Sequence, residues 1–111
     1  MTIIKQLPAV PAERTLRVIG GRWKVFVLYY LFESPQRLSS LRRKIPIASQ
    51  KVLVDALREL EAYGIVKRKV FAEVPARVEY SLTRLGASLE PIVHSLCDWG
   101  KAHASALRDV G

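Results

Sequence analysis

The segment Ser49–Gly64, with the sequence SQKVLVDALRELEAYG, constrains the fold of this chain more than any other stretch. Three leucines recur in it at the spacing of one buried helix face: Leu53, Leu57 and Leu60. Ser49 can cap the first turn, because its hydroxyl can accept a hydrogen bond from an otherwise unpartnered backbone N–H. Gly64 suits the left-handed backbone conformation that commonly ends a helix. The segment therefore predicts an amphipathic helix that packs on a core through its leucines.

A second short amphipathic segment lies just upstream over Ser39–Ile45, and Pro46 ends it because proline cannot continue a helix. We expect Ser39 to cap its first turn. Only about four residues then separate the two predicted helices, as in a helix-turn-helix. The outer face of the second helix is mostly polar and consists of Gln50, Lys51, Val54, Asp55, Arg58 and Glu61. We therefore predict a helix-turn-helix over residues 39–64.

Two β-rich segments follow, Ile65–Glu73 and Arg77–Leu82, with a proline-stiffened turn at residues 74–76 between them. This pattern predicts a hairpin over residues 65–82, and a hairpin directly after a helix-turn-helix is the winged-helix arrangement. Upstream, Trp23–Phe32 is apolar on nearly every side, which predicts a covered central helix. Gln36–Leu38 can add a short strand.

Both ends of the chain extend this unit. Residues 1–11 contain two prolines and are expected to form an extended N-terminal arm. Glu13–Ile19 predicts a short helix with Leu16 and Ile19 turned inward. A last helix is predicted over residues 83–104, capped by Thr83, with a kink or break near residues 87–90 caused by Pro91.

An apolar seam runs along the last helix with a spacing close to that of paired helices, through Leu85, Leu89, Ile92, Leu96, Trp99 and His103. The seam can pack on its own domain, but a compact winged-helix core needs only part of it, so we favour a homodimer. The expected dimer interface contains Leu16, Leu89, Ile92, Leu96, Trp99 and His103. The predicted fold class is α+β, mainly α: a single winged helix-turn-helix domain over residues 1–111 with extra N- and C-terminal dimerisation helices.

The composition of the chain is that of one soluble domain, with 111 residues of which half are apolar. Cys97 is the single cysteine, so no internal disulfide can form. The longest apolar run, Val25–Phe32, is far shorter than the ~20 residues of a membrane span, and no signal peptide is visible. We therefore expect a cytoplasmic protein with no membrane partner.

The positive charge of the chain is concentrated near the predicted helix-turn-helix. The formal net charge is +8, and the window Arg37–Arg77 contains ten basic and four acidic residues. A phosphate-binding surface requires such a concentration. The alternative is an ordinary basic protein with solvated lysines and arginines, which charge alone does not exclude.

The predicted partner is double-stranded DNA, with the second helix of the helix-turn-helix in the major groove. Phosphate contacts are expected from Ser39, Arg42, Arg43, Lys51 and Arg77, and base contacts from Gln50, Val54, Asp55 and Arg58. Ser49 completes this set with its hydroxyl at the start of the helix. Asp55 can equally pair with Lys51 one turn away, and Arg58 can pair along the same face with Asp55 or Glu61.

Other functions have weaker sequence support. No catalytic motif, phosphate loop or pair of catalytic carboxylates is present, and we expect neither enzymatic activity nor a cofactor. His94 and Asp98 have a metal-binding spacing but no second pair, and Cys97 is expected to be buried and inert. Trp23 and Trp99 are expected to be core or interface anchors, although an unknown small-molecule effector between them stays open. A protein-interaction module without specific DNA binding and a single-stranded nucleic acid or RNA binder are the remaining alternatives.

With these elements in place, the chain resembles the HxlR family of winged-helix transcription regulators, relatives of the MarR group. The similarity spans about Pro11 to His103, and its matching runs are ERTLRVIGGRW, RLSSLRRKIP, SQKVLVDALRELEAYGIVKR, EVPARVEYSLTRLG and LCDWG. The resemblance implies a prokaryotic homodimer that binds a palindromic operator, with the terminal helices at the dimer interface and the hairpin as the wing.

Two positions depart from the family pattern. Many members carry a cysteine just before the first helix, and some use it to sense oxidants or electrophiles. Val10 stands there in this chain, so thiol sensing at that position is not available. Val54 and Asp55 stand where relatives often have Thr followed by Gln or Glu, which changes the base-reading surface.

Overall fold

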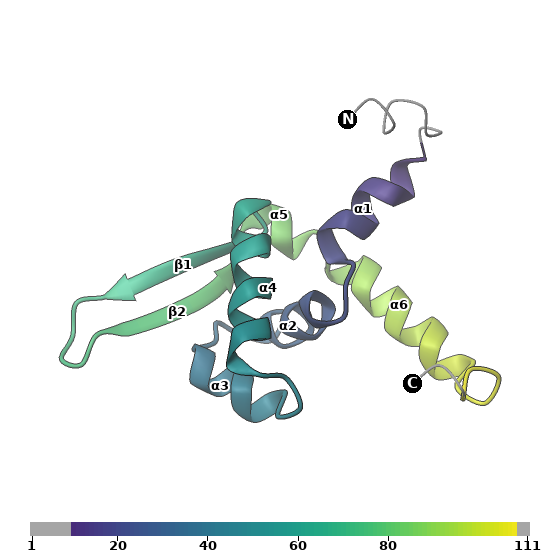
Figure 1. Cartoon of the computed structure of the whole chain (residues 1–111). Coiled ribbons are helices and arrows are strands. Elements are labelled where there is room, and N and C mark those ends of the chain that lie inside the picture. The colour runs from purple at the N-terminus through teal and green to yellow at the C-terminus, as the bar shows by residue number, and fades with distance from the viewer. Residues whose placement is uncertain (1–9, 109–111) are drawn as a thin grey trace.

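The computed structural model describes residues 10–108. The arm predicted over residues 1–11 therefore lies outside the described residues except for its last two, and Pro11 already belongs to the first helix. The elements in chain order are α1 Pro11–Ile19, α2 Trp23–Leu31, α3 Leu38–Lys44, α4 Gln50–Ala62, β1 Val66–Phe71, β2 Arg77–Leu82, α5 Arg84–Ala87 and α6 Glu90–Ala102 (Figure 1). The predicted fold class, α+β and mainly α, is confirmed.

Helix α4 has the start, the end and the buried face that its sequence predicts. The Val52 backbone N–H donates to Ser49 Oγ at 3.3 Å, so the serine caps the first turn. Gly64 follows the helix with φ +76°, in the left-handed region that favours glycine. Leu53, Leu57 and Leu60 are at most 1% exposed.

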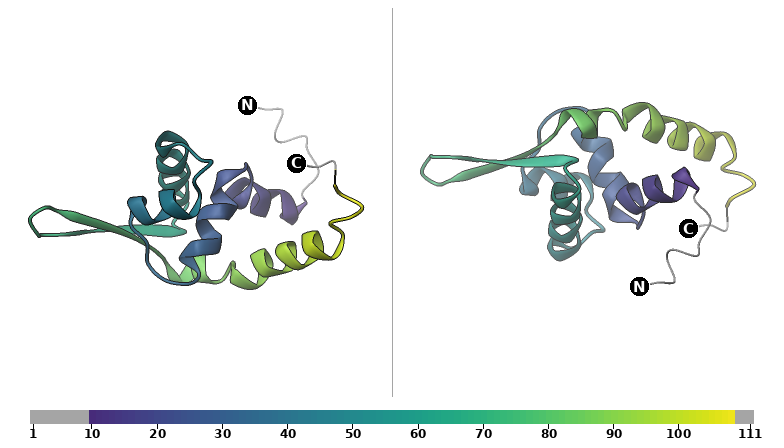
Figure 2. Two further views of the ribbon diagram at one scale, coloured as in Figure 1. Left: turned by 90° about the horizontal axis from the view of Figure 1, so that it is seen from below. Right: turned by 90° about the horizontal axis from the view of Figure 1, so that it is seen from above.

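Helix α2 lies against the leucine face of α4 and forms the centre of the core. Val27, Leu28 and Leu31 of α2 are buried, together with Leu41 of α3 and Val93 of α6. Figure 2 shows α2 between α4 and the terminal helices, so the expected central helix is confirmed. None of the helices in the described part of the chain has the length and apolar character needed to span a bilayer.

The hairpin extends away from the helices (Figure 1). Strands β1 and β2 pair antiparallel from Val66–Leu82 at the base to Phe71–Arg77 near the tip. The strand predicted over Gln36–Leu38 is reduced to one bridge, in which Gln36 and Tyr80 exchange two backbone hydrogen bonds of 2.9 and 2.8 Å. It is short because α3 already begins at Leu38.

Two local predictions are wrong. Ser39 does not cap α3, because it lies inside the helix, and Arg37 occupies the cap position without a side-chain hydrogen bond. Leu16 does not turn inward and is 60% exposed, whereas Ile19 on the same helix is buried. Helix α1 therefore contacts the core through its last turn.

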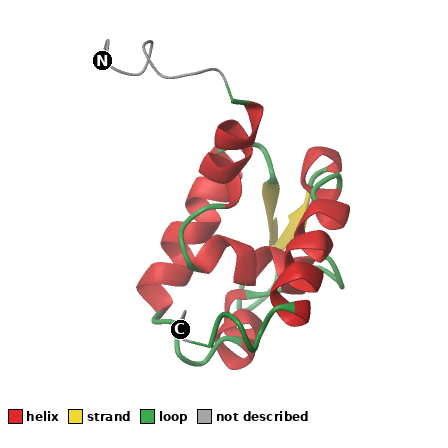
Figure 3. Cartoon of the chain, turned by 90° about the vertical axis from the view of Figure 1, so that its right-hand side faces the viewer, coloured by secondary structure: helices red, strands yellow, loops and turns green. Residues whose placement is uncertain are grey.

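The predicted break in the last helix is present and divides it into α5 and α6. Thr83 Oγ1 accepts from the Gly86 backbone N–H at 3.0 Å and caps α5, as expected. Ser88 and Leu89 separate the two helices, and Pro91 lies in the first turn of α6. Helices α1 and α6 lie at the opposite end of the molecule from the hairpin tip, and the strands lie behind the helices when viewed from that end (Figures 1 and 3).

Gly86 provides a test of how α5 packs on the chain. A Cβ at this position would collide with the Ile65 backbone carbonyl. We expect Gly86→Ala to lower the free energy of unfolding by about 1–3 kcal/mol, because the clash is with backbone that cannot move aside easily. Urea denaturation measures the effect.

Gly100→Ala is the matched control, because a Cβ there meets nothing within 4 Å. Inside α6 this change should raise the free energy of unfolding by about 0.5–1 kcal/mol through helix propensity. Equal effects of the two substitutions would contradict the close approach of α5 to Ile65.

Candidate nucleic-acid interface

The outer face of α4 is a polar ridge opposite the buried leucines. Gln50, Lys51 and Arg58 are exposed on it, and Val54 and Asp55 are partly covered. Lys51 Nζ donates to Asp55 Oδ2 at 2.9 Å, so the carboxylate holds this ammonium in place. Pairing with Lys51 was the alternative that the sequence offered to base contact by Asp55, and the structure shows this pair.

Arg58 is not drawn into a pair along the same face. Asp55 is engaged by Lys51, and Glu61 approaches Arg68 of β1, with 4.0 Å between Glu61 Oε2 and Arg68 Nε. Within residues 10–108, Arg58 makes no ion pair. Its guanidinium therefore stays available to a partner.

Helix α3 supplies a basic rim beside the start of α4. Ser39, Arg42 and Arg43 are exposed and, with Pro46 and Ala48, line a cavity of about 360 Å³. Arg42 Nη1 donates to Gln50 Oε1 at 3.1 Å and links the rim to the first residue of α4. The structure thus brings together the predicted residues of the helix-turn-helix, including Ser49 at the cap of α4.

Arg77, for which the sequence suggests a phosphate contact, is paired with acidic side chains of its own hairpin. Its guanidinium approaches Glu73 at 3.1 Å and Glu79 at 3.4 Å and lies 4.0 Å from the centre of the Phe71 ring. Arg77 Nε is buried and has no hydrogen-bond partner among the described residues. The side chain is therefore held by its own hairpin, and Lys67 and Lys69 on the same face are the more exposed cations.

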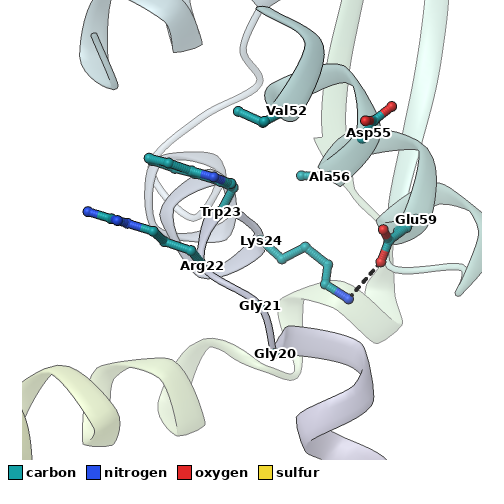
Figure 4. Close-up of a pocket in the computed structure, with 9 residues that line it drawn as sticks. All are labelled: Gly20, Gly21, Arg22, Trp23, Lys24, Val52, Asp55, Ala56 and Glu59. Carbon is teal, nitrogen blue, oxygen red and sulfur yellow. Dashed lines mark hydrogen bonds and ion pairs between the residues drawn. The ribbon is translucent and has the colours of Figure 1, made fainter. Parts of the chain in front are cut away.

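A groove on the far side of α4 was missed by the sequence analysis. It has a volume of about 420 Å³ and is lined by Gly20, Gly21, Arg22, Trp23, Lys24, Val52, Asp55, Ala56 and Glu59 (Figure 4). Lys24 is only 8% exposed, and its Nζ donates to Glu59 Oε1 and to the Arg17 carbonyl, both at 3.0 Å. A lysine within the apolar run of α2 was the one signal that could have indicated this site.

The N- and C-terminal helices carry exposed apolar side chains. Leu16 on α1 and Ile92, Leu96 and Trp99 on α6 are 44–60% exposed. The His103 ring stacks on Trp99, with 4.6 Å between ring centres. Leu89, in contrast, is buried in the core of its own chain, so its side chain is not available for the interface contact predicted for it.

Other candidate residues lie on α2 and α6. Cys97 is exposed, so the expectation of a buried thiol is wrong. His94 Nε2 lies 3.8 Å from Glu90 Oε2, and within residues 10–108 no group of three metal-ligating side chains comes together. Trp23 contacts Phe26, with 5.5 Å between ring centres, and borders the α4 groove.

A helix-turn-helix with an exposed polar second helix, followed by an antiparallel hairpin, defines the winged helix-turn-helix class of proteins. A family model described as HxlR-like helix-turn-helix matches residues 18–108. The chain belongs to this family, and it is a transcriptional regulator of the winged helix-turn-helix type.

Known relatives agree with this assignment. The chain is 54% identical to the HTH-type transcriptional regulator YkvN of Bacillus subtilis over 92 residues, which cover 83% of this chain and 78% of that protein. It is 44% identical to an HTH-type transcriptional regulator of Methanothermobacter thermautotrophicus over 99 residues, 89% of this chain and 76% of that protein. The structure of the redox regulator HypR in its reduced form is similar with a TM-score of 0.86 and 45% identity, covering 90% of this chain and 99% of that one.

The contacts of Arg77 predict a stabilising role within the hairpin. We expect Arg77→Ala to lower the free energy of unfolding by about 0.5–1 kcal/mol, because Glu73 and Glu79 lose their shared cation. Lys67→Ala is the control on the same hairpin face and should change the free energy of unfolding by less than about 0.5 kcal/mol. Thermal unfolding measures both, and an equal loss in the two variants would contradict this role.

Proposed function

We propose that this regulator is a homodimer that binds double-stranded DNA with sequence specificity. Helix α4 lies in the major groove, and the β1–β2 hairpin is the wing on the backbone or the minor groove. The observation that carries the proposal is the ridge of α4: its leucines are buried, while Gln50, Lys51 and Arg58 are exposed beside the α3 rim. An α-helix fits the major groove of B-DNA, where base pairs are distinguishable.

Phosphate contacts would come from both helices of the helix-turn-helix, and base contacts from α4 alone. Ser39, Arg42 and Arg43 of α3, with Ser49 and Lys51, would bind phosphates and fix the register without reading sequence. Gln50, Val54 and Arg58 would meet base edges, and Val54 suits a thymine methyl group. Because Lys51 is 2.9 Å from Asp55, we assign Asp55 first to the positioning of Lys51 and only second to base contact.

The wing contributes cations through its solvent face. We move the predicted phosphate contact of Arg77 to Lys67 and Lys69, because Arg77 would have to leave two carboxylates to reach DNA. Arg77 then acts by fixing the end of the wing. Lys69 lies opposite Glu79 in the hairpin, so Lys67 is the less compensated of the two lysines.

A second copy would cover the exposed side chains of α1 and α6. Leu16, Ile92, Leu96 and Trp99 are large apolar groups on the terminal helices, and burying them between two chains is favourable. A two-fold dimer presents two copies of α4, which matches a palindromic operator with half-sites about 34–36 Å apart.

Duplex binding measured against salt tests the DNA-binding part of the proposal. Fragments of the source genome selected by the protein supply the specific duplex, and a scrambled duplex is the comparison. The log–log slope of affinity against salt should be about −0.9 per neutralised phosphate. Arg43→Ala should make this slope shallower by about 0.9 and weaken both duplexes alike, because Arg43 contacts only phosphate.

Gln50→Ala separates base reading from phosphate binding. It should relax the preference at one base pair by about 1–3 kcal/mol and leave the salt slope nearly unchanged. If Gln50→Ala and Arg43→Ala behave identically, the assignment of reading and positioning roles is wrong. If the wild-type protein binds duplexes with no steep salt dependence, the chain is a protein-interaction module instead.

Leu96→Asp tests the dimer. A carboxylate in a dry apolar interface costs far more than the same group in water, so this variant should be monomeric where the wild-type protein is dimeric. Light scattering over a dilution series measures the difference, with Lys101→Asp on the same helix as the charge-changing control. A dimer of unchanged stability in Leu96→Asp would exclude this face of α6 from the interface.

A further inference from the structure

The groove lined by Gly20–Lys24 and α4 lies on the flank of α4 that is opposite α3. On one flank, Arg42 of α3 reaches Gln50, and Arg68 of β1 approaches Glu61, about three helical turns further along. On the other flank, the helical repeat aligns Val52, Ala56 and Glu59, which line the groove (Figure 4). Lys51 and Arg58 point outward between the two flanks.

The acidic side chains of the groove are already compensated within the chain. Asp55 is paired with Lys51 at 2.9 Å, and Glu59 is paired with the buried Lys24 at 3.0 Å. Arg22 is exposed and makes no ion pair within residues 10–108. Within the described part of the chain, it is therefore the one groove residue whose charge is not compensated.

Arg22 is also held at the rim of the groove. Its guanidinium lies 5.0 Å from the centre of the Trp23 ring, and the two side chains extend side by side in Figure 4. Gly21 beside it has φ +80°, and the position of its missing Cβ faces open space. A polymer backbone can therefore approach this rim closely.

A helix in the major groove has a phosphate strand on each side. The major groove of B-DNA is about 12 Å wide, and a helix with its side chains is about 10–12 Å across. Both DNA backbones therefore border the flanks of a helix that lies in the major groove. The arginines of α3, Arg42 and Arg43, lie beside one flank of α4 and can bind the strand on that side. Among residues 10–108, the groove with Arg22 lies on the other flank.

We propose that Arg22 binds a backbone phosphate of the DNA strand that borders α4 on the side away from α3, and that the groove receives this strand. The proposal rests on the proposed DNA-binding function and adds a second backbone contact to it. Lys24 neutralises Glu59, so this carboxylate does not repel the strand.

Salt dependence of duplex binding tests the contact. Arg22→Gln should make the log–log slope shallower by about 0.9 and weaken the selected and the scrambled duplex by the same factor, because a phosphate contact carries no sequence information. Arg22→Lys should keep the slope. Arg84→Gln removes the same charge at an exposed position of α5 and should leave both slope and affinity unchanged. Thermal unfolding checks that each variant is folded.

Neutral methylphosphonate linkages locate the phosphate. Replacing phosphates one at a time in the selected duplex should reveal one position that weakens wild-type binding but has no effect on Arg22→Gln. This position should lie on the opposite border of the major groove from the position that is coupled in the same way to Arg43→Ala. If Arg22→Gln fails to fold, the wild-type scan alone still has to show sensitive phosphates on both borders.

The outcomes separate this inference from the proposed function. Steep salt dependence in the wild-type protein with no change in Arg22→Gln overturns the role of Arg22 and leaves the proposed function intact. A methylphosphonate scan in which only phosphates on the α3 side weaken binding also overturns the role of Arg22 and leaves the proposed function intact. A wild-type protein that does not bind duplexes overturns both.

Discussion

The burial of the leucine face of α4 against α2 is the contact on which the rest of the structure depends. Leu53, Leu57 and Leu60 are almost completely buried, and each contributes about 1.5–3 kcal/mol by leaving water. Since the helical repeat fixes the opposite side once this face is inward, the same contact exposes Lys51 and Arg58. Stability of the core and presentation of the polar ridge therefore have one cause.

Ion pairing on the flanks of α4 then selects the cations that remain for a partner. The acids on this helix are taken by Lys51, by the buried Lys24 and, more distantly, by Arg68. Arg77 on the wing is likewise occupied by its own hairpin. Among the described residues, cations without an acidic partner lie on three sides of α4: on the α3 rim, on the outer ridge with Arg58, and at Arg22. This distribution suits a helix placed between two phosphate strands.

Sequence patterns that depend on neighbouring residues predicted their elements well. The cap at Ser49, the end at Gly64, the hairpin and the break before Pro91 all follow from local backbone chemistry. Predictions that required knowledge of distant packing were less successful. Cys97 is exposed because α6 leaves the body of the molecule after Val93, and Leu89 is buried because α5 turns it into the core.

The sequence by itself determined the order of the helices and strands, the buried face of α4 and the concentration of positive charge around it, because these follow from spacing and composition. Only the tertiary structure decided which charges are compensated. Lys24 and Glu59 are 35 residues apart along the chain. Arg42 and Gln50 are closer in sequence but belong to different helices, and folding brings each pair within hydrogen-bonding distance. Such pairings depend on how α2, α3 and α4 pack against one another, and no local pattern in the chain encodes that geometry.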